Sequence, residues 1–382
     1  MKISQSLKSE FLIPDDISYL NCAYMSPLSK ATVAAGKSAV ELKAHPYKIK
    51  PDDFFETVEL IRTEFAKLIY GSAEDVAVIP SVSYGIAMLA KNIELSPGDE
   101  IIVIEEQFPS NIYSWIRLAK NNGAELTVIK SPETNEKRGM AWNEKILSAI
   151  SPKTKVVTMG IVHWSDGTLF NLSAIRKKTA KCGSLLLLDG TQAIGALPFN
   201  VNEIKPDALI VAGYKWLMCP YATGFAWLGE YFKDGIPLEE SWINRKGSSN
   251  FAGLVKYQDE FASGARRFDM GEKSNFALNP MVLTALRQVN EWGPENIQIY
   301  VSSISEQPVQ ELISRGFWVE DKEFRGSHLF GVRVPPGTDL ELIRQKCETQ
   351  NVFVSIRGSA IRVAPHIYND AHDFEKLIQS LS

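Results

Sequence analysis

Seven short apolar runs, separated by longer amphipathic stretches, constrain the fold of this chain more than any other feature. Each run is six to eight residues long and rich in Val, Ile or Leu. They lie at 75–80, 100–106, 125–130, 155–162, 184–189, 207–213 and 224–229, and helical patterns lie between them at 83–93, 110–122, 143–150 and 172–182. Strands that are apolar on both faces and alternate with helices are typical of a mainly parallel sheet between helical layers. The sequence therefore predicts an α/β fold with a seven-stranded sheet.

The pattern changes towards the C-terminus. The stretch 230–275 is polar and irregular, and a helical pattern follows at 280–293. Segments 328–335, 339–351, 352–365 and 370–381 then predict a strand, a helix, a hairpin and a helix. We therefore expect a large domain of residues 1–275 and a smaller α+β domain of residues 276–382.

Composition and charge exclude several classes of protein. The net charge of −4 and the pI of about 5.9 argue against nucleic acid and anionic membranes as partners. Four cysteines without CxxC pairing favour reduced thiols. The N-terminus lacks the apolar core of a signal peptide, and no apolar run approaches the ~20 residues of a membrane span. We expect a soluble, cytoplasmic protein.

A lysine and a carboxylate follow two of the predicted strands. Asp189 ends the run of four leucines before it, and Lys215 follows the strand 207–213 between two aromatic residues. Ligands of open α/β sheets bind beyond the carboxyl ends of the strands. A lysine in a desolvated pocket loses pKa and becomes nucleophilic towards aldehydes. Taken singly, Lys215 also fits a surface lysine with a packed stem, and Asp189 a cap of the next turn.

Together these two residues predict a site for pyridoxal 5′-phosphate (PLP), which requires an anion for its ring nitrogen and a lysine for a Schiff base. The segment SVSYG (81–85), between a strand and a helix, offers backbone N–H groups to the phosphate, and Ser83 adds a hydroxyl. Phe108 is placed to lie against the pyridine ring. The alternatives are that Ser83 is a helix N-cap and that Phe108 belongs to the core.

Other enzyme classes lack their sequence signals. The five histidines show no HxxEH or HxH spacing, so no metal ligands are predicted. A serine hydrolase would need a GxSxG elbow, which the chain lacks. A non-catalytic PLP-binding regulator stays open as an alternative, because it would retain Lys215 and Asp189 without the geometry for proton transfer.

Six segments in order resemble the class V aminotransferase family of fold-type-one PLP enzymes. They are YLNCAYMSP (19–27), SVSYG (81–85), EEQFPSNIYSW (105–115), VHWSDG (162–167), LLLLDGTQAIG (185–195) and VAGYKW (211–216). The family includes cysteine desulfurases, selenocysteine lyases, kynureninases and isopenicillin N epimerase. The resemblance implies an enzyme that acts at the Cα of an amino acid as a transaminase or a lyase, with an epimerase or racemase as the alternative.

The resemblance also implies roles for individual residues. Lys215 carries the Schiff base and moves protons at the substrate Cα, Asp189 keeps the pyridine nitrogen protonated, and Gln192 contacts the phenolic oxygen. The implied cofactor-binding set is Ser83, Tyr84, Phe108, Ser165, Asp189, Gln192, Tyr214, Lys215, Ser274 and Asn275. Residues 1–275 are then the PLP-binding domain, with segment 1–25 near the active site.

The segment IRVAPHIYND (361–370) resembles the family's carboxylate-binding segment. It implies that Arg362 clamps the α-carboxylate of the substrate, a task that suits a planar guanidinium. Arg357 is a second candidate, and Asn21 and Ala23 are expected at the substrate entrance. Further pocket candidates are Trp164, Tyr24, Trp242 and Arg245.

Two departures from the family qualify these expectations. Residues from about 270 to 276 match the segment that reaches the partner's phosphate in a homodimer, but Glu272 stands where threonine is usual. We therefore expect Lys273, Ser274 or Asn275 to make that contact. Desulfurases carry a reactive cysteine before the carboxylate-binding arginine, whereas this chain has no cysteine after Cys347, which falls in a predicted helix. A persulfide-forming desulfurase is not expected.

Overall fold

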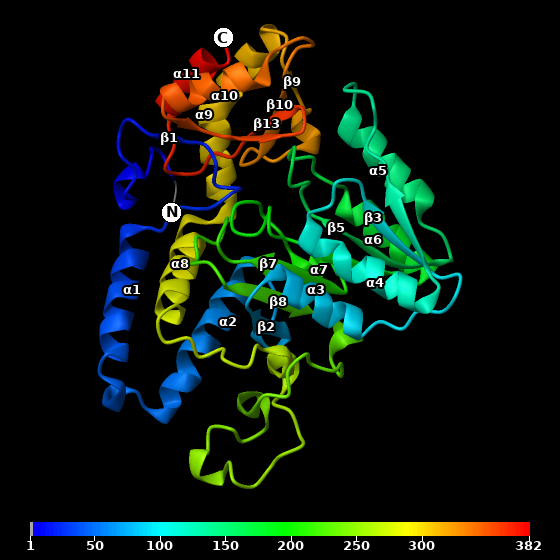
Figure 1. Cartoon of the computed structure of the whole chain (residues 1–382), viewed down its shortest axis with the longest axis vertical. Helices are drawn as coiled ribbons and strands as arrows, with labels where there is room; N and C mark the ends of the chain where they lie inside the picture. The colour runs from blue at the N-terminus through cyan, green and yellow to red at the C-terminus, as the bar shows by residue number, and fades with distance from the viewer. Residues whose placement is uncertain (1–2) are drawn as a thin grey trace.

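A seven-stranded sheet forms the centre of the protein in a computed structural model that describes residues 3–382 (Figure 1). Its strands run in the order β2-β8-β7-β6-β5-β3-β4. Strand β8 runs opposite to the other six strands of this sheet. The strands are β2 (Val76–Ile79), β3 (Glu100–Ile104), β4 (Glu125–Ile129), β5 (Thr154–Gly160), β6 (Leu185–Asp189), β7 (Ala208–Ala212) and β8 (Gly224–Leu228). The predicted fold class and all seven predicted strands are confirmed.

Helices cover both faces of this sheet. Along β7, Leu209 and Val211 pack into one hydrophobic cluster, and Ala208, Ile210 and Ala212 pack into another on the opposite face. The helices between the strands are α3 (Val82–Lys91), α4 (Tyr113–Asn122), α5 (Arg138–Ala149), α6 (Leu172–Cys182) and α7 (Val201–Ile204). Two buried faces explain why inner strands such as β7 and β8 are apolar throughout.

Helix α5 begins at Arg138, earlier than the predicted start at 143. Arg138 is buried in an ion pair with Asp166, at 2.9 Å between Nη1 and Oδ2. Tertiary contacts of this kind extend a helix beyond what its own periodicity indicates.

Four helices were not predicted: the short α7 and the longer α1 (Lys30–Lys43), α2 (Glu56–Leu68) and α9 (Pro294–Ser314). Helix α9 contains Pro308, a residue that usually interrupts a helical pattern. The predicted helix at 280–293 is confirmed as α8 (Asn279–Trp292), which packs against α1 and α2. No helix among residues 3–382 is long and apolar enough to cross a membrane.

A second, four-stranded antiparallel sheet lies near the C-terminus, in the order β12-β13-β10-β9. Its strands are β9 (Trp318–Val319), β10 (Phe330–Arg333), β12 (Ser355–Arg357) and β13 (Ala360–Val363), with helices α10 (Leu340–Thr349) and α11 (Ala371–Ser380). The predicted hairpin is confirmed for β12 and β13. Strand β11 (Val352–Phe353) instead pairs with β1 (Ser18–Tyr19), so the N-terminal segment joins the C-terminal part. The domain boundary at residue 275 stays a prediction.

The stretch 230–275 contains only short 3-10 turns, as its irregular sequence indicates. Asp269 anchors its end in the core. One Asp269 oxygen accepts from the Val78 N–H at 2.8 Å, and the other accepts from Arg62 Nη2 and Lys273 Nζ, each at 2.8 Å. All three charged side chains are buried. This cluster fixes the segment next to the predicted dimer contact.

Replacing Asp269 with asparagine should lower the free energy of unfolding by about 3–5 kcal/mol, because two buried cations lose their shared counter-charge. Urea unfolding followed by circular dichroism measures the change. Glu260→Gln is the control, since its ion pair with Lys246 is exposed and contributes little. Equal unfolding midpoints for wild type and Asp269→Asn would show that the cluster does not stabilise the fold.

Candidate active site

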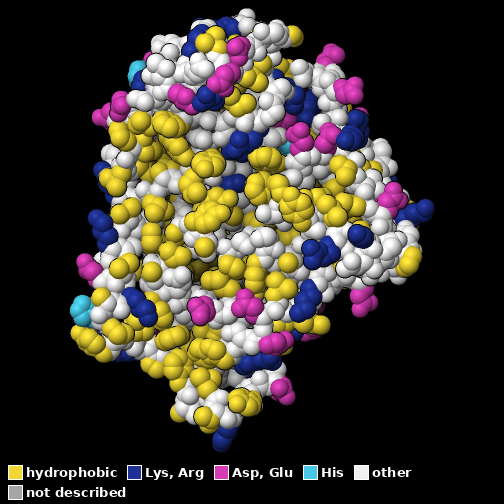
Figure 2. Space-filling view, in the orientation of Figure 1, with side chains coloured by type: hydrophobic (Ala, Val, Ile, Leu, Met, Phe, Trp, Pro, Cys, Tyr) yellow, Lys and Arg dark blue, Asp and Glu magenta, His cyan; other side chains and the backbone are white. Residues whose placement is uncertain are grey.

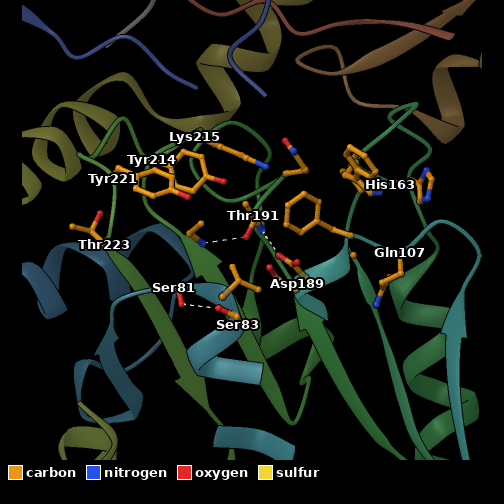
Figure 3. A pocket seen from close by; sticks show the side chains of 18 of the residues that line it. Ser81, Ser83, Gln107, His163, Asp189, Thr191, Tyr214, Lys215, Tyr221 and Thr223 are labelled. Carbon is orange, nitrogen blue, oxygen red and sulfur yellow. Dashed lines mark hydrogen bonds between the residues drawn. The ribbon is translucent and has the colours of Figure 1, made fainter. Parts of the chain in front are cut away.

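A cavity of about 420 Å³ lies at the carboxyl ends of β2, β3, β5, β6 and β7. Each of these strands contributes the residues that directly follow it, and Figure 3 shows their side chains converging on one space. Open α/β sheets place their ligand sites at this edge. The residues predicted from strand ends therefore meet at a single site.

Lys215 projects into this cavity from the segment after β7. Its side chain is buried and forms no ion pair or hydrogen bond with residues 3–382. The amine nitrogen lies 5.2 Å from the centroid of the Phe108 ring and 5.6 Å from that of Tyr214. Burial, together with the positive charge of Arg362, lowers the pKa of Lys215 to about 8. The neutral, nucleophilic form of this amine is therefore much more populated near neutral pH than in an ordinary lysine.

Asp189 lies at the end of β6 and lines the same cavity. One of its carboxylate oxygens accepts the Thr191 N–H at 2.9 Å. It forms no ion pair with a described residue, and burial raises its pKa. A buried carboxylate without a cationic partner is unfavourable, so a ligand that brings an N–H donor or a positive charge would stabilise it.

Gln192 follows Asp189 and connects the cavity wall to the N-terminal segment. Its amide oxygen accepts from Trp216 Nε1 at 2.9 Å, and its amide nitrogen donates to the Ala23 carbonyl at 3.2 Å. One amide N–H remains for a ligand. Trp216 is fully buried, and its ring packs edge-on against that of His328 with 4.7 Å between centroids.

One side of the cavity is rich in hydroxyl groups, which come from Ser81, Ser83, Tyr214, Tyr221 and Thr223 (Figure 3). Tyr221 and Thr223 were missed from the sequence because they precede a strand. That strand, β8, is antiparallel, so its first residues lie at the carboxyl ends of its neighbours. The antiparallel direction of β8 is not visible in its apolar run.

The N-cap alternative for Ser83 is wrong, because Ser81 caps α3. The Ser81 hydroxyl accepts the Tyr84 N–H at 3.2 Å and lies 2.9 Å from the Ser83 hydroxyl. Ser83 therefore keeps its hydroxyl at the cavity. The Tyr84 N–H is already bonded, and its side chain packs against the core.

Phe108 lines the cavity and packs edge-on against Trp164, with 5.4 Å between ring centroids. Ser165 is not among the residues that line it. Its hydroxyl lies 3.0 Å from His163 Nδ1, which is also 3.1 Å from the Asp166 carboxylate. Ser165 thus supports His163, which lines the cavity opposite the hydroxyl groups.

Arg362, on β13, is buried behind Trp164. Its Nη1 donates to the Trp164 carbonyl at 2.9 Å and its Nη2 to the Ser355 hydroxyl at 3.5 Å. Asn21 accepts from the same Ser355 hydroxyl at 2.9 Å and lines a second cavity of about 650 Å³ with Arg357 and Tyr24.

Trp242 and Arg245 do not line either cavity within the chain. Both belong to the stretch 230–275, where Trp242 packs against Phe251 and Arg245 against Phe261. Both side chains take part in local packing. Residue type alone does not distinguish an aromatic or basic side chain that packs locally from one that binds a ligand.

The residues expected at the dimer contact are already bonded within one chain. Lys273 pairs with Asp269, and the Ser274 hydroxyl donates to the Phe54 carbonyl. The Asn275 side chain accepts the N–H groups of residues 277 and 278. Contact with a partner's phosphate stays a prediction.

The sequence profile described as Aminotransferase class-V matches residues 45–376. The chain belongs to this family. The uncharacterised aminotransferase YcbU of Bacillus subtilis is a relative that is 25% identical over 329 residues, which cover 86% of this chain and 84% of YcbU. Isopenicillin N epimerase of Streptomyces clavuligerus is 22% identical, with 99% of this chain and 97% of the epimerase covered.

Among solved structures, the cysteine desulfurase of Thermococcus onnurineus has the same fold. It superimposes with a TM-score of 0.84 at 18% sequence identity, and 99% of this chain and 97% of the desulfurase are covered. The fold of this member of the class V aminotransferase family is therefore that of the PLP enzymes of fold type one.

Class V aminotransferases use pyridoxal 5′-phosphate, and it is the cofactor of this enzyme. The residues of the cavity fit it. Lys215 and Asp189 are buried ionisable groups without ion-pair partners in the described chain, and PLP supplies an aldehyde to the first and a ring nitrogen to the second. The cluster of hydroxyl groups fits a phosphate.

Cofactor uptake should accelerate as the pH rises through about 8. The lowered pKa of Lys215 means that the neutral, reactive amine predominates above that pH, while the ammonium form predominates below it. Stopped-flow absorbance of cofactor-free protein mixed with PLP, between pH 6.5 and 11.5, measures the rate. A midpoint near 10.5, the ordinary lysine value, would show that Lys215 is not desolvated.

Proposed function

We propose that this class V aminotransferase removes the proton from the Cα of an amino acid, with Lys215 as the base, and acts as a transaminase or a lyase. The observation that carries the proposal is the pair of buried groups without ion-pair partners, Lys215 and Asp189, on neighbouring strand ends of one cavity. Arg362 lies near enough to lower the pKa of Lys215.

Each group then has a defined task. PLP, when bound, withdraws electrons from the bonds at Cα. Asp189 holds the proton on the ring nitrogen, which preserves that withdrawal. Lys215 takes the Cα proton in its neutral form. Arg362 binds the α-carboxylate through its free Nε and its Nη2, because Nε has no partner in the described chain.

The cysteines support a reaction other than persulfide formation. Cys22 and Cys219 are buried, and burial raises the pKa of Cys22 to about 12. Cys347 lies inside α10, and Cys182 ends α6 at the opposite edge of the sheet. The turn between β12 and β13 consists of Gly358 and Ser359 and carries no thiol. Sulfur transfer would need an exposed thiolate near the substrate.

Epimerisation is the second candidate, because a relative named isopenicillin N epimerase aligns with nearly the whole chain. Both candidates share the loss of the Cα proton and differ in the fate of the resulting carbanion. A non-catalytic PLP-binding regulator would bind the cofactor without exchanging this proton.

A panel of L- and D-amino acids tests the proposal. The PLP-loaded enzyme is incubated with each amino acid in D₂O, and exchange of the Cα proton for deuterium is followed by NMR. The same samples are analysed for oxo acid, pyruvate, sulfide and racemate. We expect exchange accompanied by an oxo acid or an elimination product. Racemate without either would establish epimerisation instead, and cofactor binding without exchange of any substrate would favour the regulator.

We further propose that the enzyme is a cytoplasmic homodimer with segment 270–276 at the interface. Hydrophobic side chains gather across the middle of the face in Figure 2, and Tyr24, Met25 and Tyr221 are exposed. Apolar areas of this kind often mark an interface. Light scattering should give twice the chain mass of 42.6 kDa. The four free cysteines fit a reducing compartment.

A further inference from the structure

Two guanidinium groups lie side by side at the substrate end of the site. Arg357 and Arg362 project from β12 and β13, which pair in one hairpin. Both contact the same indole ring, with the guanidinium carbon of Arg357 5.6 Å and that of Arg362 6.0 Å from the centroid of Trp164. Because Trp164 lines the first cavity and Arg357 lines the second, this cluster bounds both cavities.

Neither arginine has an anionic partner within residues 3–382. Arg362 donates to a carbonyl and a hydroxyl, and Arg357 donates to the Ile356 carbonyl at 3.0 Å. The Nε atoms of both are buried and have no hydrogen-bond acceptor. Burial lowers the pKa of Arg362 to about 10, and the charge of Arg357 contributes. Arg362 is buried and Arg357 is half-buried, so this pair of cations without a counter-charge favours the binding of anions from outside the chain.

The nearby carboxylates are already committed. Glu348 is the one carboxylate that lines the second cavity among the described residues, and it pairs with Arg344. Asp189 is the one carboxylate that lines the first cavity among the described residues, and in the proposed function it faces the ring nitrogen of the cofactor. The hydroxyl groups that fit the phosphate belong to a different set of residues. With the α-carboxylate on Arg362, Arg357 keeps an unmatched charge.

We propose that the natural substrate is an amino acid with a second anionic group on its side chain, a carboxylate or an equivalent oxyanion, and that Arg357 binds this group. The inference rests on the proposed function, because Arg362 and Lys215 must fix the α-carboxylate and Cα. The second cavity, which Arg357 lines, gives the side chain room to extend. The planar guanidinium group of arginine can donate two parallel hydrogen bonds to one carboxylate.

Binding of unreactive acids tests the inference without catalysis. Succinate and glutarate, compared with propionate and butyrate, are titrated into the loaded enzyme by calorimetry. We expect the dicarboxylates to bind about 10- to 100-fold more tightly, the range of hydrogen bonds to charged groups. Arg357→Gln should remove this preference and Arg357→Lys should keep part of it. Arg315→Gln, an exposed arginine paired with Glu311, is the control.

Turnover gives a second readout. In the wild-type enzyme we expect kcat/KM to be higher for L-aspartate than for L-asparagine, or for L-glutamate than for L-glutamine. This ratio should fall about 10- to 100-fold in Arg357→Gln, as the binding preference for dicarboxylates does. A wild-type enzyme that prefers monocarboxylates, or a ratio that Arg357→Gln leaves unchanged, overturns the inference. If Arg357→Gln does not fold, the comparison of dicarboxylates with monocarboxylates in the wild-type enzyme decides the question. Failure of Lys215 to take up PLP would instead reject the proposed function.

Discussion

Lys215→Ala should reduce kcat for every amino acid substrate by about 10⁴-fold, the upper end of the contribution of a positioned base. The variant loses both the amine that attaches the cofactor and the group that takes the Cα proton. Single-turnover kinetics, with PLP held in excess to compensate for weaker binding, measures the loss. Lys215 is the group to test because it is buried and has no ion-pair partner in the described chain.

Two further variants separate chemistry from charge. Lys215→Arg keeps a positive charge but cannot lose its proton near neutral pH, so it should be as inactive as the alanine variant. Lys177→Ala, on the exposed face of α6, should leave kcat unchanged. Activity of Lys215→Ala above about one tenth of wild type would contradict its assignment as the base.

Asp189→Asn should lower kcat by about 10²–10³-fold, comparable to the loss of one preorganised electrostatic contact in other active sites. Asparagine has the same shape but carries no charge to hold the proton on the ring nitrogen. The cofactor should still bind, because Lys215 and the hydroxyl groups remain. Steady-state kinetics, together with a measurement of the bound PLP, therefore distinguishes a loss of catalysis from a loss of the cofactor.

Asp207→Asn is the matched control for Asp189. This aspartate also lies at a strand terminus of the same sheet but before β7, at the opposite edge, where it pairs with Arg176. It should change stability without changing kcat per folded enzyme. A kcat within threefold of wild type for Asp189→Asn would show that this carboxylate does not act on the ring.

The central sheet was predictable because strands buried on both faces leave short runs of apolar residues, as in β6, β7 and β8. The edge strand β4 is partly exposed, but its Leu, Val and Ile still mark it as a strand. The helices outside the sheet were less predictable. Helix α9 contains Pro308 and is stabilised by packing, with Val301 and Leu312 buried in different clusters. Strand β11 reads as part of a hairpin, but it pairs with β1 from the other end of the chain. Such long-range pairing leaves no local pattern.

The site followed from one rule, that ligands bind where parallel strands end. That rule placed Lys215, Asp189 and Phe108 at one cavity, where the structure also has them. It omitted Tyr221 and Thr223, because the reversal of β8 is a property of the sheet and not of the segment.

The most direct test of the account is to find where PLP attaches. The protein is loaded with PLP, reduced with borohydride to fix the link to the amine, digested, and mapped by mass spectrometry. We predict one modified peptide, with the cofactor on Lys215, and no specific modification in Lys215→Ala. A stoichiometric label on another lysine, or an unlabelled wild-type protein, would contradict the assignment of this cavity as a PLP site.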